Sequence, residues 1–345
     1  MLPAPVRVPM GGAAVVYRHA EGLAARGHDV TVAAPRRGDG LRGRILRGAT
    51  RLRDRWHAVA DVPLMGASGV RTVEVETPGH LNALTYDSVI ATGHQTAPWV
   101  DRALKGRSSG RVYFIQHDER YLSPKAAASW RLPFTRITIA HWIADLLRSH
   151  DAPVDAVVPN AIDPAEFHVT RDLKARDSRV IALYHRLPVK GPDTLLDTLH
   201  LLKARMPDLQ ADVLAARPPS HTLPGWASVH IRPEREVLRD LYNRAQVCLH
   251  TSRLEGWGLV PMEAAACGCA VAATESRGVS EFLSSGTSMV TAEAGNAGQL
   301  VDAACSLLQN TDLRIRTARA GLEDVARFSW DDSTDTFEAS LLASA

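Results

Sequence analysis

The sequence predicts an α/β protein made of two doubly wound halves, each a parallel sheet with helices on both faces. Short apolar, β-branched runs alternate with helical stretches along most of the chain, and the alternation restarts after residues 157–163. The length of 345 residues is too great for one ordinary core and suits two. We therefore expect domains over 1–155 and 156–328, followed by a helical tail over 329–345.

In the first half, a helix is expected over 13–26, because Val16, Ala20 and Leu23 recur at helical spacing before Gly27. Strands are expected at 29–34, 70–75, 88–92 and 112–116, and helices at 95–104 and 137–148. A doubly wound domain normally opens with a buried strand before its first glycine turn. Here that turn follows a proline-containing dozen residues without a clear strand. Either the first strand is a stub or the true start precedes Met1, and mass spectrometry of the native protein would decide.

The second half repeats the pattern more clearly. Strands are expected at 179–184, 212–216, 229–231, 247–251 and 270–273. Helices are expected at 192–205, 235–245, 261–266, 297–309, 313–328 and 332–342. Pro261 is expected as the first residue of its helix, a position that proline favours.

The bulk composition excludes several classes of protein. A net charge of +2 gives no global reason to expect nucleic-acid binding, and no stretch has the pattern of a signal peptide or a membrane span. The four cysteines have neither the number nor the spacing of a disulfide framework or a zinc site, which favours a reduced, cytoplasmic protein. The Arg-rich stretch 40–56 could touch anionic lipid or form a mobile acceptor flap, but a solvated helix packed on its domain is favoured.

The most informative segment is LEGWGLVPMEAAACG, which follows the expected strand VCLHT. Its glycine-rich turn leads into a helix, so the backbone N–H groups of Gly258, Leu259 and Val260 would point outward with the helix dipole behind them. Such a turn is a natural seat for a diphosphate. Glu255 before the seat and Glu263 in the expected first helical turn flank it. Either glutamate alone could be a solvated loop residue or one that complements the dipole, but the pair around the glycines favours a site.

A second segment, HRLPVKGPD, places Arg186 and Lys190 after another expected strand. Ligands of open α/β sheets bind at the carboxyl ends of the strands, and these cations would suit a departing diphosphate. Taken alone, they are somewhat better explained as surface cations. His117 also follows a strand and could bond a sugar hydroxyl or the acceptor, although a lone histidine is more often structural. Gly12 would let a ligand approach the backbone closely, and Asn160 is either a donor-binding or a turn residue.

In this order and context the segments resemble the family 4 retaining glycosyltransferases of the GT-B fold. The resemblance includes GG before a helix ending in ARGHDVTV, then IQH, VVPNAID and HRLPVKGPDTLL, and the two glutamates with the seven residues GWGLVPM between them. TYDSVIATGHQTA followed by VYFIQHDERY further resembles rhamnosyltransferase-like members. The resemblance implies two Rossmann-like domains facing a central cleft, with the acceptor on the N-terminal half. The nucleotide sugar would lie on the C-terminal half, and the last helix would cross back to the first domain.

Carried over by position, Glu255 would contact the transferred sugar and Glu263 the ribose. Arg186 and Lys190 would hold the diphosphate with the amides of the glycine turn, His117 would lie near the reacting centre, and Gly12 near the diphosphate or acceptor. The implied reaction moves a hexose-type sugar to a hydroxyl acceptor with retention. No cofactor or metal is expected, because no Asp-x-Asp motif ends a strand. The alternatives are a non-hydrolysing nucleotide-sugar epimerase of the same fold and a catalytically silent sugar-nucleotide-binding protein.

Overall fold

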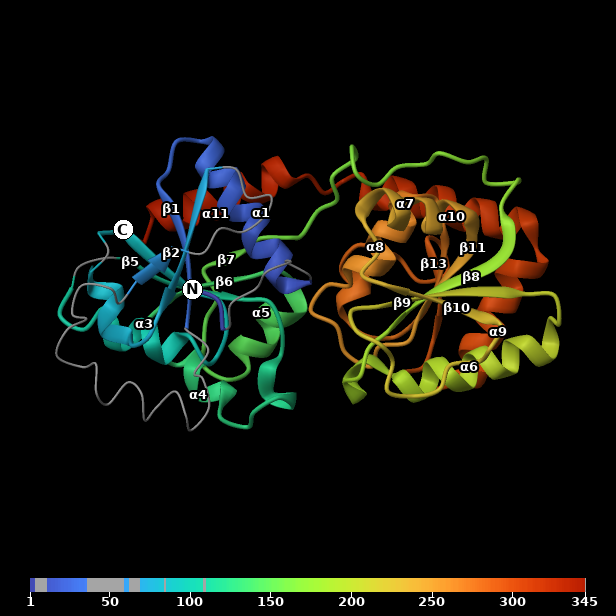
Figure 1. Ribbon diagram of the computed structural model, residues 1–345, viewed down its shortest axis with the longest axis horizontal. Helices are drawn as coiled ribbons and strands as arrows, with labels where there is room; N and C mark the ends of the chain where they lie inside the picture. The colour runs from blue at the N-terminus through green and yellow to red at the C-terminus, as the bar shows by residue number, and fades with distance from the viewer. Residues whose placement is uncertain (4–10, 36–58, 62–68, 84, 108–109, 345) are drawn as a thin grey trace. The chain divides into compact units, whose positions relative to one another are not determined.

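The computed structural model describes residues 1–3, 11–35, 59–61, 69–83, 85–107 and 110–344. The chain forms two compact units, Met1–Pro159 with Trp330–Ala345 and Asn160–Ser329 (Figure 1). The divisions therefore fall after residues 159 and 329, where the sequence suggested 155 and 328. The C-terminal segment belongs to the first unit.

The first unit contains two sheets. One has the order β1-β3-β2, with β1 (Val30–Pro35) and β3 (Val70–Val75) parallel and β2 (Val59–Asp61) antiparallel to β3. The other is parallel with the order β4-β5-β6-β7, formed by β4 (Ser88–Ala91), β5 (Gly110–Ile115), β6 (Thr135–Thr138) and β7 (Ala156–Val157).

Residues Met1 and Leu2 join these two sheets. The Leu2 amide donates to the Ala33 carbonyl of β1 at 2.8 Å, and the Met1 ammonium donates to the Ile90 carbonyl of β4. These two buried residues thus lie where a doubly wound sheet has its first strand. The rest of the segment before the glycine turn, 4–10, lies outside the described residues, as does the Arg-rich stretch 40–56.

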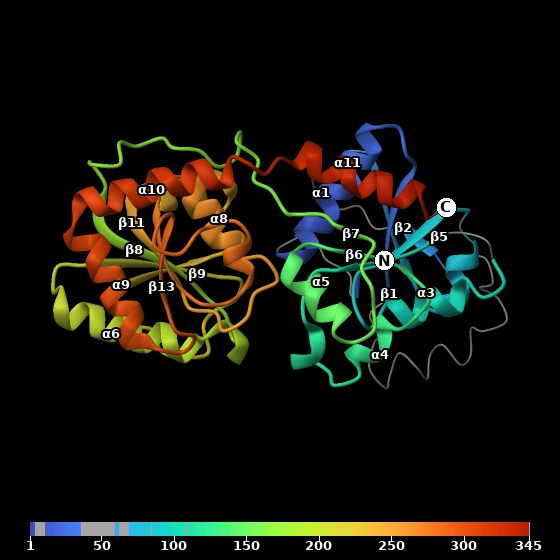
Figure 2. The ribbon, with the colours of Figure 1, turned by 180° about the vertical axis from the view of Figure 1, so that it is seen from behind.

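In its described residues, the first unit has the helices α1 (Gly12–Ala25), α3 (Ala97–Ala103), α4 (Ala126–Trp130), α5 (His141–Arg148) and α11 (Trp330–Leu342). Helices α1 and α11 lie side by side although they are far apart in sequence (Figures 1 and 2). The buried His19 ring of α1 stacks on Phe337 of α11 at 4.4 Å between centroids and meets the edges of Phe114 and Trp330. Aromatic contacts of this kind fasten the end of the chain to the first unit.

The second unit contains one parallel sheet with the order β10-β9-β8-β11-β12-β13. Its strands are β8 (Asp177–Tyr184), β9 (Gln210–Ala215), β10 (Ala227–Ile231), β11 (Ala245–His250), β12 (Ala270–Thr274) and β13 (Met289–Ala292). Its helices are α6 (Pro192–Arg205), α7 (Arg235–Arg244), α8 (Leu259–Ala266), α9 (Ala297–Gln309) and α10 (Thr311–Val325). Helices α6 and α9 cover one face of the sheet, and α7, α8 and α10 cover the other (Figures 1 and 2).

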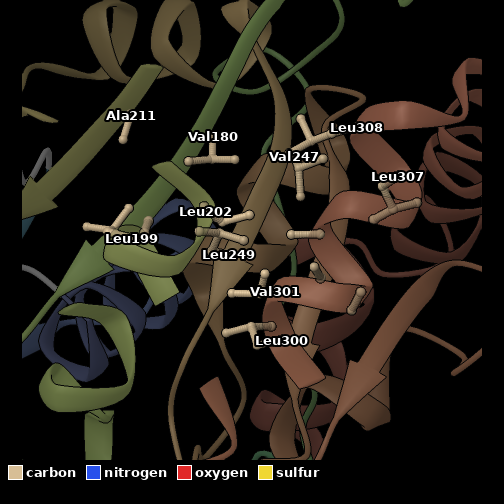
Figure 3. Close-up of a cluster of buried hydrophobic side chains, with 14 of the residues drawn as sticks. Val180, Leu199, Leu202, Ala211, Val247, Leu249, Leu300, Val301, Leu307 and Leu308 are labelled. Atoms are coloured by element: carbon tan, nitrogen blue, oxygen red, sulfur yellow. The ribbon is translucent and has the colours of Figure 1, made fainter. Parts of the chain in front are cut away.

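The core of the second unit lies mainly between this sheet and helices α6 and α9 (Figure 3). Val180, Val247 and Leu249 of the strands meet Leu199 of α6 and Val301 of α9, and all are essentially inaccessible to water. Each such side chain contributes about 1.5–3 kcal/mol through burial. This packed layer holds the carboxyl ends of β8 and β11 in fixed positions.

Two sequence predictions about elements are wrong. The helix expected over 137–148 begins only at His141, because residues 135–138 form strand β6 in the middle of the sheet. The helix expected from Pro261 begins at Leu259, so Pro261 is its third residue. All four cysteines lie in the described part of the chain, where each is buried and free, as expected for small apolar side chains.

Candidate active site

The candidate site lies at the carboxyl ends of β8 and β11. The strand order of the second unit reverses between these two neighbouring strands. Strands β8, β9 and β10 follow one another toward one edge of the sheet, and β11 then pairs with the other side of β8. Loops that leave such neighbours diverge to opposite faces of the sheet and open a crevice, which is the usual ligand position in this architecture.

The loop after β8 is fixed by backbone contacts to the loop after β11. Its short 3-10 turn Pro188–Lys190 ends at Gly191, which has a φ of 64°. A Cβ at Gly191 would collide with the Thr251 carbonyl oxygen, so only glycine fits. Thr251 Oγ1 donates to the Lys190 carbonyl at 3.1 Å, and the Arg253 amide donates to the Val189 carbonyl at 2.8 Å. Lys190 is therefore held against the neighbouring loop.

Two predicted residues meet here. Lys190 Nζ donates to Glu255 Oε2 at 2.6 Å, and the side chains are only 16% and 11% exposed. The hydroxyl of Ser252 donates to the other carboxylate oxygen, Oε1, at 2.8 Å. The Glu255 amide in turn donates to the Ser276 carbonyl after β12 at 2.9 Å. The carboxylate is thus held from both sides on a loop whose backbone is itself anchored.

The electrostatics keep Glu255 ionised. Burial alone would raise its pKa, but the Lys190 ammonium, the nearby His250 and the hydrogen bonds from Lys190 and Ser252 outweigh burial and hold the pKa below its usual value. Burial lowers the pKa of His250 to about 4, so this ring is neutral near pH 7. Its Nε2 lies 3.1 Å from Ser276 Oγ.

Helix α8 begins at Leu259, four residues after Glu255 in the chain. Its N-cap, Gly258, has a φ of 105°, a conformation that side-chain-bearing residues rarely adopt. The N–H groups of Leu259 and Val260 belong to the first helical turn and have no intrahelical partners, whereas Pro261 has no N–H. The positive end of the α8 dipole thus follows the loop after β11, and Lys190 lies on the adjoining loop after β8. This arrangement suits an anion.

Glu263 is placed differently from the prediction. Because α8 begins at Leu259, Glu263 lies in the second turn and not the first. Its carboxylate accepts from the Tyr242 hydroxyl of α7 at 2.8 Å and from Arg235 Nη1 at 3.5 Å. Burial raises its pKa to about 7, with Arg235 and Tyr242 offsetting only part of that effect. Glu263 therefore titrates near neutral pH.

The other predicted residues of the second unit do not join this cluster. Arg186 is exposed, and its Nη2 donates to the Pro218 carbonyl of the loop after β9 at 2.7 Å. Asn160 is buried, and its Oδ1 has no hydrogen-bond partner within the described chain.

In the first unit, Gly12 opens α1 against the end of β5. A Cβ there would lie 3.1 Å from Oε1 of Gln116, the residue before His117. His117 Nε2 lies 3.0 Å from the Tyr121 hydroxyl. The glycine turn and the IQH segment thus meet at the carboxyl end of β5.

Sequence reasoning missed the residues that hold the two glutamates, namely Ser252, Tyr242 and Arg235. Ser252 lies three residues before Glu255, on the same loop, and this closeness is the only signal it offered. It also missed Arg277, whose φ of 66° and ψ of −59° form a strained γ-turn closed by the Gly278 amide on the Ser276 carbonyl at 2.9 Å.

Residues 178–310 match the family model described as Glycosyl transferases group 1. Among curated proteins, the chain is similar to D-inositol 3-phosphate glycosyltransferase of Corynebacterium urealyticum, at 28% identity over 54% of this chain and 50% of the relative. It is also similar to the protein of that name from Corynebacterium kroppenstedtii, at 26% identity over 76% of this chain and 60% of the relative. The chain thus spans about half to three fifths of the length of these relatives.

Solved structures share the fold. Sucrose-phosphate synthase from Thermosynechococcus elongatus superposes with a TM-score of 0.77 at 16% identity, covering 97% of this chain and 94% of that one. Anabaena Alr3699/HepE, in complex with UDP-glucose, gives a TM-score of 0.74 at 16% identity, covering 98% and 97%. No helix in the described residues is long and apolar enough to cross a membrane. The chain is therefore a GT-B-fold protein of two Rossmann-like units, and its residues 178–310 match the model of the group 1 glycosyl transferases.

Proposed function

We propose that this protein transfers a hexose-type sugar from a nucleotide-diphosphate donor to a hydroxyl acceptor, with retention of anomeric configuration and without a metal ion. The observation that carries the proposal is the Lys190–Glu255 ion pair, formed at the switch point of the sheet on the loop that leads into α8. A cation and unpaired amides suit a diphosphate, and an ionised carboxylate suits sugar hydroxyls.

In this proposal the chain stabilises charge on the departing diphosphate. Lys190 and the amides of Leu259 and Val260 would neutralise it as the bond to the sugar breaks, which is electrostatic stabilisation by groups already in place. Arg186 would leave the Pro218 carbonyl to add a second cation. Glu255, whose pKa is held low, would accept hydrogen bonds from the sugar hydroxyls throughout.

The remaining predicted residues would serve the ribose and the acceptor. Glu263 would bind the ribose hydroxyls, and Asn160, with its unpaired Oδ1, would bond the donor. Gly12 and His117 would form part of the acceptor subsite of the first unit. The acceptor hydroxyl would attack on the face that the diphosphate leaves, with a phosphate oxygen as its base.

No metal is needed if the site's own cations do this work. Within the described residues no three His, Cys, Asp or Glu side chains are grouped to hold a metal ion. The proposal therefore predicts that donor binding and turnover survive EDTA.

The first experiment is a thermal-shift screen against UDP-, GDP-, dTDP- and ADP-linked sugars, with and without EDTA. Among these donors we expect a UDP-sugar to raise the Tm most, since UDP-glucose is bound in a solved structure of the same fold. Transfer is then assayed with a panel of hydroxyl acceptors that includes D-inositol 3-phosphate, the acceptor named for the curated relatives.

The outcomes separate the candidate functions. Donor consumed only with an acceptor supports a transferase, donor isomerised by the protein alone identifies an epimerase, and binding without turnover identifies a silent binder. NMR of the product's anomeric proton tests retention. Glu255→Ala should lower kcat by about 100-fold or more. Near-wild-type activity of that variant would remove Glu255 from the site.

A further inference from the structure

The two glutamates of the motif are held in the same way, each by one cation and one hydroxyl. Glu255 accepts from Lys190 and Ser252, and Glu263 accepts from Arg235 and Tyr242. The hydroxyls come from different elements, the loop after β11 and helix α7. In each pair the hydroxyl bonds the carboxylate at 2.8 Å.

Ser252 is itself rigidly placed. It is 4% exposed, and its carbonyl accepts from Thr274 Oγ1 of β12 at 2.6 Å. The same Thr274 hydroxyl lies 3.2 Å from the His250 carbonyl, so β12 fixes the end of β11 and the start of the loop together. Because the backbone of Ser252 is already held in this way, directing its hydroxyl to a single acceptor has a low entropic cost.

We propose that Ser252 is a positioning residue that holds the Glu255 carboxylate in place for the transferred sugar. This inference rests on the proposed function. Lys190 has two partners to serve in that function, the diphosphate and Glu255, so its bond to Oε2 weakens whenever its charge is shared. Among the residues that the structure describes, the Ser252 hydroxyl donates to Glu255 alone and keeps Oε1 fixed, which leaves the orientation of the carboxylate unchanged during the reaction.

The inference predicts two separable consequences of removing this hydroxyl. The carboxylate would lose a donor that favours its ionised form, so the Glu255 pKa should rise in Ser252→Ala. The groups that set this pKa besides Ser252 are Lys190 and His250, and both remain. The loss of orientation should lower kcat by about 10- to 100-fold, while the KM for the donor changes less than about threefold.

The experiment combines a titration and a kinetic assay on the full chain. The pKa of Glu255 is measured from its side-chain carboxyl ¹³C shift, identified by its absence in Glu255→Gln, in wild type, Ser252→Ala, Ser252→Cys and Ser252→Thr. Threonine keeps the hydroxyl and should restore both values, and the weakly donating thiol should fall between. Ser306→Ala is the matched control, because the Ser306 hydroxyl donates to the Ala303 carbonyl of its own helix α9 and to no other group in the described part of the chain. Tyr242→Phe removes the corresponding hydroxyl from Glu263 and should leave the Glu255 pKa unchanged.

A raised Glu255 pKa with a selective fall in kcat, both restored by threonine, supports the positioning role. An unchanged pKa in Ser252→Ala overturns it, even if activity falls, because the loss would then be structural. If the wild-type protein transfers no sugar from any donor, the proposed function fails, and the titration still decides whether Ser252 holds Glu255.

Discussion

Replacing Lys190 with methionine tests the electrostatic construction of the site. The change keeps an unbranched chain of similar length but leaves the Glu255 carboxylate, 11% exposed, without its cation at 2.6 Å. Breaking a fully buried ion pair from one side costs about 3–5 kcal/mol. Because both side chains retain some contact with water and Ser252 still donates to Glu255, we expect a loss of about 2–3 kcal/mol in the free energy of unfolding at pH 7.

The loss should depend on pH with a definite sign. In the wild type the folded pKa of Glu255 lies below its ordinary value of 4.5, so its contribution to stability is present above that pH and is lost as the pH falls through the folded pKa. Without Lys190, burial is no longer outweighed and the folded pKa should rise above 4.5. The penalty of Lys190→Met should therefore be small near pH 4 and grow toward pH 7.

Urea unfolding of wild type, Lys190→Met, Glu255→Gln and the double variant at pH 4 and pH 7 measures this. The double variant should recover most of the stability lost at pH 7, because no charge is left buried without a partner. A single-variant loss below about 0.5 kcal/mol, or one equal at both pH values, would show that the pair does not hold Glu255 ionised.

Four further changes test other parts of the structure. Burial lowers the pKa of His19 to about 4, so the free energy of unfolding should fall by about 3 kcal/mol as the pH falls from 6.5 to 4. Urea unfolding of His19→Phe should lack this pH dependence. An equal pH dependence in that variant would refute the assignment. Glu263, with its pKa raised to about 7, should lower stability as the pH rises from 4.5 to 7, and Glu263→Gln should remove that decline from the same melts. Leu199→Ala should cost about 2–5 kcal/mol by urea unfolding, and a loss under 1 kcal/mol would contradict its place in the core. Gly191→Ala should lower both the Tm and the affinity for a nucleotide diphosphate, because its Cβ meets the Thr251 carbonyl; unchanged affinity would show that the turn does not position Lys190.

Much of the second unit could be predicted because its strands are continuous apolar runs between clear helices. The first unit was harder where two elements adjoin. In residues 135–148, Ile137, Ala140, Ile143 and Ala144 are spaced like one helical face, and all are buried. Periodicity alone therefore extends the helix back through β6. Only the position of this segment between β5 and β7 makes Thr135–Thr138 a strand, and that position is set by tertiary pairing.

The sequence predicted which strand ends carry the candidate residues, but not the orientation of their side chains. The meeting of Lys190 with Glu255 could be anticipated because both follow strands, and parallel strands present their carboxyl ends at one edge. Whether Arg186 turns toward that edge or toward the Pro218 carbonyl depends on the loop after β9, whose shape no local pattern specifies. Ser252 and Tyr242 were missed for the same reason, since a serine or a buried tyrosine gains its role only from the acceptor it faces.

The two glutamates face different neighbours because helix α8 begins between them. Glu255 precedes the Gly258 N-cap and faces the loop after β8, whereas Glu263 follows it by one helical turn and faces α7. One segment therefore places two carboxylates on different neighbours with different charge environments. Close pairing with Lys190 keeps Glu255 ionised well below neutral pH, whereas burial raises the pKa of Glu263 to about 7 because the 3.5 Å contact with Arg235 offsets only part of its effect. A pH change across neutrality would thus alter the charge of Glu263, the proposed ribose contact, while Glu255, the proposed sugar contact, stays ionised. Donor affinity should therefore change with pH near 7, well above the pH at which Glu255 loses its charge.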